Sequence, residues 1–230
     1  DYSSAASDVY KRQILLFGGI ISAFLGPSLA NYSKDFVSEN LYVGSYLSLA
    51  VLTFIPTILF LFYESKSINK ENINYTGRSY LELISQPRFI QALAASAFGY
   101  AIMTFLMTAT PISMHVMEKM SLSKTGIVIQ FHVASMFLPS LVTGHLIKKI
   151  GHSNVIYIGI FFYSITLFIS IFDQTFFNYM FALIFLGIGW NFLFISGTSL
   201  LVLTYEEKEK YKAQGLNDFI VYSVHELSKQ

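Results

Sequence analysis

Six long apolar runs that contain no Asp, Glu, Lys or Arg limit what this chain can fold into more than any other feature of its sequence. A transmembrane helix needs about 20 mostly apolar residues to cross about 30 Å of hydrocarbon. We therefore predict that each run forms a membrane-spanning helix. The six runs are 14–32, 41–63, 89–114, 126–147, 154–172 and 176–205, and a shorter seventh run, 213–224, is predicted to begin a further helix.

The composition favours a membrane protein over a large soluble helical protein. Of the 230 residues, 13% are charged and 53% are hydrophobic, whereas about 25% of the residues of a soluble domain are charged. Soluble helices also carry charged side chains along one face, and these runs do not. A signal peptide is excluded for the first run because several further spans follow it. We predict an all-α, polytopic membrane protein.

Several functional classes receive no support from the sequence. The net charge of +1 does not indicate binding to nucleic acid, and the absence of Cys excludes disulfides, Cys-based zinc sites and thiol catalysis. The sequence contains no HExxH motif, no nucleotide-binding loop and no nucleophile elbow. We therefore expect neither an enzyme nor a cofactor or metal site.

The basic residues predict how the chain is oriented, because cytoplasmic loops are enriched in Lys and Arg. Nine of them lie in one set of alternating loops and three in the opposite set. The first set includes 64–87, a long polar connection that we predict to be a cytoplasmic linker with a short surface helix at 80–84. The nine are Lys66, Lys70, Arg78, Arg88, Lys148, Lys149, Lys208, Lys210 and Lys212, and the three are Lys34, Lys119 and Lys124.

The first thirteen residues are expected to be a non-native leader. Residues 3–13, SSAASDVYKRQ, resemble the codon-by-codon translation of a transposase sequencing adapter. Such segments are excluded from fold reasoning, so Lys11 and Arg12 do not count toward the orientation. We expect the native sequence to begin at Ile14.

Two short motifs stand at positions where membrane helices pack or turn. The first run contains GGIISAFLGP, in which small residues allow close helix packing and Pro kinks the helix. The connection TGHLIKKIGHSN is predicted to be a tight cytoplasmic turn. Packing and the positive-inside rule explain each motif by itself. The candidate residues for a conformational role are Gly19, Gly26, Pro27, Gly144, Lys148, Lys149 and Gly151.

Taken together with the long linker, these motifs resemble the major facilitator superfamily. GGIISAFLGP is similar to the Gly-Pro motif of its fifth helix, and GHLIKKIG is similar to the loop between its eighth and ninth helices. The acidic residue of that loop motif is absent near Lys148. The resemblance implies a partial fold: 14–63 would be the last two helices of the N-terminal half, 64–87 the linker, and 88–230 part of the C-terminal half. Helices one to four of the parent chain would be missing.

The resemblance also implies a function. Members of this superfamily are secondary transporters that move a small-molecule substrate across the lipid bilayer by alternating access, here with protons as a candidate coupling ion. The expected location is the inner membrane of a bacterium, and the direction is left open between uptake and efflux. The chain by itself is expected not to transport. The polar or aromatic candidates for the substrate or proton pathway are Gln130, His132, Trp190, Asn191, Tyr100 and Thr104.

Each candidate has a structural alternative. His132 could be a neutral side chain bonded between helices, a substrate contact or a proton carrier. Trp190 and Asn191 could pack against neighbouring helices or contact substrate.

The whole protein could also be a membrane-embedded enzyme, for which the sequence offers too few clustered polar residues, or a non-transporting scaffold or sensor. Convergence of Gln130, His132 and Asn191 on one cavity would favour a transport site, and their separate packing would favour the scaffold.

Overall fold

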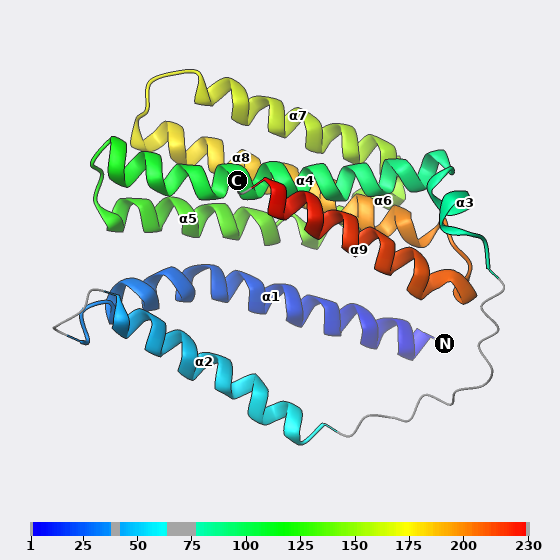
Figure 1. Cartoon of the computed structure of the whole chain (residues 1–230), viewed down its shortest axis with the longest axis horizontal. Helices are drawn as coiled ribbons and strands as arrows, with labels where there is room; N and C mark the ends of the chain where they lie inside the picture. The colour runs from blue at the N-terminus through cyan, green and yellow to red at the C-terminus, as the bar shows by residue number, and fades with distance from the viewer. Residues whose placement is uncertain (1, 38–41, 64–76, 229–230) are drawn as a thin grey trace.

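The computed structural model describes residues 2–37, 42–63 and 77–228, with side chains from Gly18 onward, and the described residues form helices and no strand (Figure 1). The helices follow the predicted runs closely. They are α1 (Tyr2–Ser33), α2 (Val43–Leu61), α3 (Tyr80–Ile84), α4 (Pro87–Ile112), α5 (Leu122–Phe137), α6 (Ser140–Ile150), α7 (His152–Ser170), α8 (Phe176–Val202) and α9 (Lys210–Leu227), with a π-helical turn at Ser113–Met117 and a 3-10 turn at Glu207–Glu209.

Five segments of the described chain are long and apolar enough to cross a membrane. They are Val43–Leu61, Pro87–Met117, Leu122–Ile150, His152–Ser170 and Phe176–Val202. The first predicted run, 14–32, lies within α1, and the seventh, 213–224, lies within α9. The fold class predicted from the sequence, an all-α polytopic membrane protein, is therefore confirmed.

The connections divide between the two ends of the molecule as the basic residues predict. Figure 1 shows α3, the α6–α7 turn and the α8–α9 connection at one end, and the α4–α5 and α7–α8 connections at the other. The surface helix predicted at 80–84 is α3, which begins with a capping box between Ser79 and Glu82. Residues 64–76 of the predicted linker lie outside the described residues.

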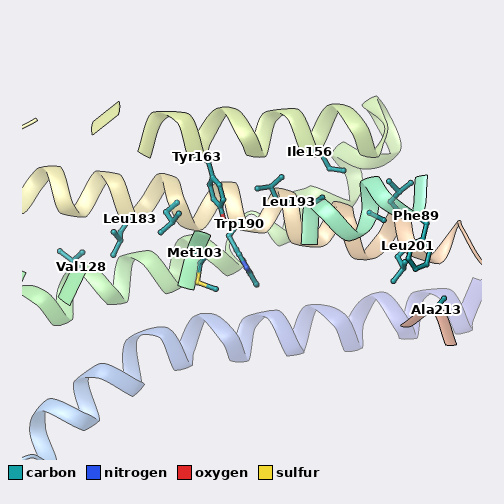
Figure 2. Packing of buried hydrophobic residues seen from close by; sticks show 14 of the residues in the cluster. Phe89, Met103, Val128, Ile156, Tyr163, Leu183, Trp190, Leu193, Leu201 and Ala213 are labelled. Atoms are coloured by element: carbon teal, nitrogen blue, oxygen red, sulfur yellow. The ribbon is translucent and has the colours of Figure 1, made fainter. Parts of the chain in front are cut away.

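Helix α8 is the centre of a bundle formed by α4 to α9, and α1 and α2 lie along one side of this bundle (Figure 1). Helices α4, α5 and α7 all pack on α8, and buried side chains such as Leu183, Leu193 and Leu201 fill the contacts (Figure 2). Glycine permits the closest approach. A Cβ atom on Gly187 would lie 2.7 Å from the His132 carbonyl oxygen of α5, and one on Gly197 would lie 2.8 Å from the Ala92 carbonyl oxygen of α4.

One predicted span is broken in the middle. The run 126–147 is divided between α5 and α6, which meet at Leu138 and Pro139. Proline has no backbone N–H and interrupts the hydrogen-bond ladder of a helix. In a membrane such a break persists where neighbouring helices supply partners for the freed backbone groups.

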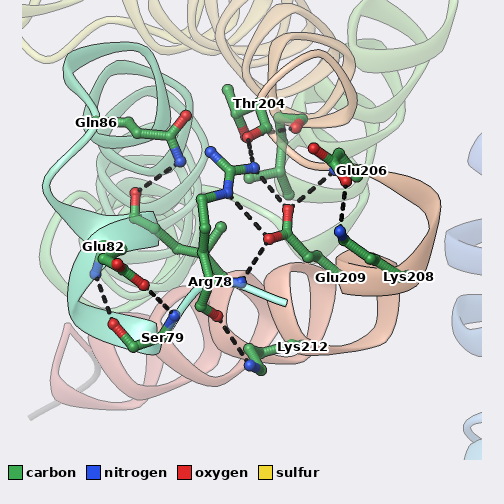
Figure 3. A network of polar contacts seen from close by, with 11 residues as sticks. Arg78, Ser79, Glu82, Gln86, Thr204, Glu206, Lys208, Glu209 and Lys212 are labelled. Carbon is green, nitrogen blue, oxygen red and sulfur yellow. Dashed lines mark hydrogen bonds and ion pairs between the residues drawn. The ribbon is translucent and has the colours of Figure 1, made fainter. Parts of the chain in front are cut away.

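An ion pair joins the end of the linker to the connection between α8 and α9 (Figure 3). Arg78 donates from Nε to Glu209 Oε1 at 2.9 Å and from Nη2 to Glu209 Oε2 at 2.6 Å, and its backbone N–H donates to the same carboxylate at 2.7 Å. The Glu209 side chain is 1% exposed. Hydrogen bonds from the Arg78 side chain, followed by those from backbone N–H groups, hold the pKa of Glu209 well below its ordinary value.

The same residues tie α9 to the linker. Lys212 donates from Nζ to the Arg78 carbonyl oxygen at 2.9 Å and lies 5.4 Å from the centre of the Tyr80 ring. The Glu206 backbone N–H donates to Glu209 Oε2 at 3.0 Å. This network fixes the first turn of α9 against α3, and thereby sets how α9 lies along α4.

Candidate substrate site

Helices α4, α8 and α9 bring a group of aromatic side chains together. Tyr100 and Thr104 are four residues apart on α4, Trp190 and Phe194 are four apart on α8, and Tyr222 and His225 are three apart on α9. Residues at these spacings share one face of a helix. We call Tyr100, Thr104, Trp190, Phe194, Tyr222 and His225 the aromatic cluster.

Tyr100 is the ring that connects the three helices. Its centroid lies 6.2 Å from that of Trp190 and 5.8 Å from that of Phe194, both on α8. On the other side it lies 6.4 Å from Tyr222 and 4.8 Å from His225, both on α9. Trp190 and Phe194 stack with centroids 4.9 Å apart and planes 9° apart. The cluster is therefore a continuous aromatic surface built from three helices.

The Thr104 hydroxyl group forms a hydrogen bond within the cluster, whereas the indole N–H of Trp190 forms none with any described residue. Thr104 Oγ1 is 2.9 Å from His225 Nδ1, a hydrogen bond that joins α4 to α9. Trp190 Nε1 is buried and has no hydrogen-bond partner among the described residues. In Figure 2 the Trp190 side chain extends from α8 away from α7, toward the side of the bundle where α1 lies. Trp190 therefore lies on the side of α8 opposite to α7.

Gln130 lies outside the aromatic cluster, at the contact between α5 and α1. Its Nε2 donates to the Phe24 carbonyl oxygen at 3.1 Å and to Ser28 Oγ at 2.8 Å. Phe24 and Phe131 meet edge to face in the same contact, with centroids 6.4 Å apart. Gln130 therefore bonds α5 to α1 in this conformation.

His132 is fully buried between α5 and α8. Its Nδ1 lies 2.8 Å from the Leu183 carbonyl oxygen. A carbonyl only accepts hydrogen bonds, so Nδ1 carries the proton in this contact, and Nε2 has no partner among the described residues. This is the geometry of a histidine bonded between helices.

Asn191 holds the break between α5 and α6. Its Nδ2 donates to the Met136 carbonyl oxygen at 2.6 Å and to Ser140 Oγ at 2.5 Å, and its Oδ1 accepts from Thr143 Oγ1 at 2.6 Å. Asn191 follows Trp190 directly, and successive helical residues lie on different faces. The Asn191 side chain therefore contacts α5 and α6, whereas the Trp190 side chain lies in the aromatic cluster.

The conformational candidates lie at helix contacts and at one turn. A Cβ atom on Gly19 would lie 2.9 Å from the Phe137 ring, so this glycine allows α1 to approach α5, whereas Gly26 and Gly144 have no such neighbour within 4 Å. Pro27 is inside α1. Gly151 joins α6 to α7 with a φ of 84°, a conformation that favours glycine. Lys148 and Lys149 occupy the last turn of α6, where cations are favoured.

The six pathway candidates thus separate into different sites. Trp190, Tyr100 and Thr104 come together, while Gln130, His132 and Asn191 each make a separate interhelical contact. Phe194, Tyr222 and His225 were missed by the sequence reasoning. Phe194 is signalled by its spacing of four from Trp190. No group of three or more His, Asp or Glu side chains that could bind a metal ion occurs in the described part of the chain.

The fold is that of a polytopic helical membrane protein. The sequence model of the Major Facilitator Superfamily matches residues 14–224. The chain belongs to this superfamily.

Curated relatives are similar to the chain over most of its length. It is 36% identical over 223 residues to the riboflavin transporter RfnT of Brucella anthropi, an alignment that covers 95% of the chain and 56% of that relative. It is 28% identical to two uncharacterized transporters of Bacillus subtilis, YdeG and YddS, over 86% and 87% of the chain and 50% of each relative. The chain spans about half the length of these relatives. No solved structure matches it.

Proposed function

We propose that the protein containing this chain is a secondary transporter of a small, planar aromatic solute, with riboflavin as the first candidate. The observation that carries the proposal is the aromatic cluster, in which four aromatic rings and an imidazole from three helices form one surface. Contacts between aromatic rings contribute about 0.5–1.5 kcal/mol per pair beyond the area that they bury. The three fused rings of a flavin suit such a surface.

The position of the cluster supports transport by alternating access. In secondary transporters the substrate site lies between two helical bundles that move relative to each other. Trp190, the cluster residue labelled in Figure 2, extends from α8 toward the side of the bundle where α1 lies. Because its rings come from α4, α8 and α9, movement of α9 against the other two helices would open or close it.

We also propose that protons drive the transport, with His225 as the candidate proton carrier of the site because of its place in the cluster. The groups that face His225 are Thr104 at 2.9 Å, the Tyr100 ring at 4.8 Å between centroids and the Glu226 carboxylate at 3.8 Å. His132 is a less suitable carrier because it is sealed between α5 and α8.

Uptake of labelled riboflavin by a bacterial strain that cannot make or import it tests this function. Cells that express the full-length transporter in their inner membrane should show saturable uptake that a protonophore reduces. We expect cells that express only residues 14–230 to show none, because this segment matches only about half the length of its curated relatives. Absence of uptake with the full-length protein would reject riboflavin as the substrate.

A non-transporting scaffold or sensor is the second candidate. The observation in its favour is that Gln130, His132 and Asn191 do not converge on a cavity and each bonds one helix to another. This is the outcome that separate packing predicts. Saturable uptake of riboflavin in the same assay would reject this candidate, since a scaffold would bring no labelled solute into the cell at any concentration.

A further inference from the structure

The indole N–H of Trp190 is one of three buried side-chain polar groups in the described chain that have no hydrogen-bond partner. Tyr163 donates to the Gly99 carbonyl oxygen at 2.6 Å, and Asn191 uses both its amide nitrogen and its oxygen. Trp190 is 9% exposed and its Nε1 has no partner among the described residues. Leaving a buried donor unpaired is unfavourable, and the N–H of a buried tryptophan usually has a partner.

The other two unpartnered buried atoms in the described chain are His132 Nε2 and Ser196 Oγ. His132 Nε2 is an acceptor within the contact between α5 and α8, and neither atom belongs to the aromatic cluster. Trp190 Nε1 is therefore the unpartnered donor of that cluster. It is attached to the ring that stacks on Phe194 and lies beside Tyr100. A group that binds there can stack on the rings and also accept a hydrogen bond.

We propose that Trp190 is the specificity-determining residue of the site: it donates a hydrogen bond from Nε1 to a carbonyl oxygen of a planar heterocycle that stacks in the aromatic cluster. The inference rests on the proposed function and narrows its substrate class. A flat aromatic solute without a carbonyl or an equivalent acceptor would gain the stacking contact alone. The isoalloxazine ring of riboflavin carries two carbonyl groups and meets both requirements.

In the present conformation the cluster is closed on itself. Tyr222 and His225 of α9 lie against Tyr100, and the hydrogen bond between Thr104 and His225 holds α9 to α4. An entering heterocycle must displace α9 from this position to reach Trp190. The Trp190 N–H then gains an acceptor. It has no partner among the described residues in the closed, empty site and forms a hydrogen bond to the ligand in the occupied site.

The test compares wild type with Trp190→Phe, which keeps an aromatic ring and removes the donor. Riboflavin and 10-methylacridinium, a planar tricycle without a hydrogen-bond acceptor, are titrated into the full-length protein that contains this chain, in lipid nanodiscs. We expect the Kd for riboflavin to rise about fivefold to tenfold, the gain of a typical hydrogen bond. The Kd for 10-methylacridinium should change less than twofold.

Each other outcome rejects a defined part of the inference. If the substitution leaves the Kd for riboflavin unchanged, Trp190 does not donate to the ligand. If it weakens riboflavin and 10-methylacridinium equally, Trp190 contributes through its ring and the proposed hydrogen bond is wrong. If wild type binds 10-methylacridinium but not riboflavin, the carbonyl requirement is wrong. If wild type binds neither compound, the proposed substrate class fails, and the inference fails with it.

Discussion

Replacing Gly187 by alanine should lower the free energy of unfolding by about 3 kcal/mol, the upper part of the range for overpacking a close contact. A Cβ atom at this position would overlap Ser135 Oγ and lie 2.7 Å from the His132 carbonyl oxygen. The second contact is with backbone, so a side-chain rotation cannot relieve it. Helices α5 and α8 would have to separate at the centre of the bundle. Thermal and denaturant unfolding in detergent measure the loss.

The matched control is Gly126→Ala, also in a helix but with no atom within 4 Å of the added Cβ. Alanine is favoured over glycine inside a helix by up to about 1 kcal/mol, so this variant should be as stable as wild type or more stable. Equal stability of the Gly187 and Gly126 variants would contradict the close packing of α5 on α8.

Replacing Arg78 by methionine should lower the free energy of unfolding by about 3 kcal/mol. This is the lower limit for removing one partner of a buried ion pair, and we choose it because the Arg78 side chain is 36% exposed. The substitution leaves the Glu209 carboxylate, which is 1% exposed, without its cation. The loss should be largest at neutral pH, where an unpaired carboxylate is ionised. Pairing the change with Glu209→Gln should restore part of the stability because the buried charge is then gone.

The pH dependence of the wild type follows from the same pair. The pKa of Glu209 is held well below its ordinary value of 4.5, so the pair stabilises the fold above about pH 4.5. This contribution should be lost as the pH falls below that value, and the loss should be smaller in the Arg78→Met/Glu209→Gln variant.

Glu207→Gln, which removes an exposed pair with Lys210, should change stability by less than about 1 kcal/mol. A loss in that control as large as in Arg78→Met would contradict the buried pair.

The spans of this protein could be predicted from sequence because a bilayer demands long uncharged runs. The helices α2, α4, α5–α6, α7 and α8 lie on the runs that this rule selects. The short helix α3 could also be predicted from its amphipathic pattern. The break at Pro139 was not predicted. Whether a proline only kinks a membrane helix or interrupts it depends on whether neighbouring helices provide partners for the freed backbone groups. Here Asn191, on a different helix, supplies the partner.

Only some residues of the aromatic cluster could be predicted from the sequence, for a physical reason. Polar side chains are unfavourable in lipid, so Gln130, His132 and Asn191 were selected as candidates. A hydrogen bond to a neighbouring helix stabilises such a side chain as well as a hydrogen bond to a substrate does. In this protein each of the three bonds to a neighbouring helix. The aromatic cluster needs Tyr100, Trp190 and His225 to meet, and they come from helices that are far apart in the chain. That convergence is a property of the packing.

The absence of Cys from this chain allows the most direct test of the substrate site. In the full-length protein that contains this chain, with any further cysteine replaced, Tyr222→Cys places one thiol at the edge of the aromatic cluster, and Ser121→Cys places one in the α4–α5 connection. The measurement is the rate at which a water-soluble maleimide labels each thiol. We predict that saturating riboflavin slows the labelling of Tyr222→Cys severalfold and leaves that of Ser121→Cys unchanged. Equal labelling of Tyr222→Cys with and without riboflavin would contradict the assignment of the substrate site to this cluster.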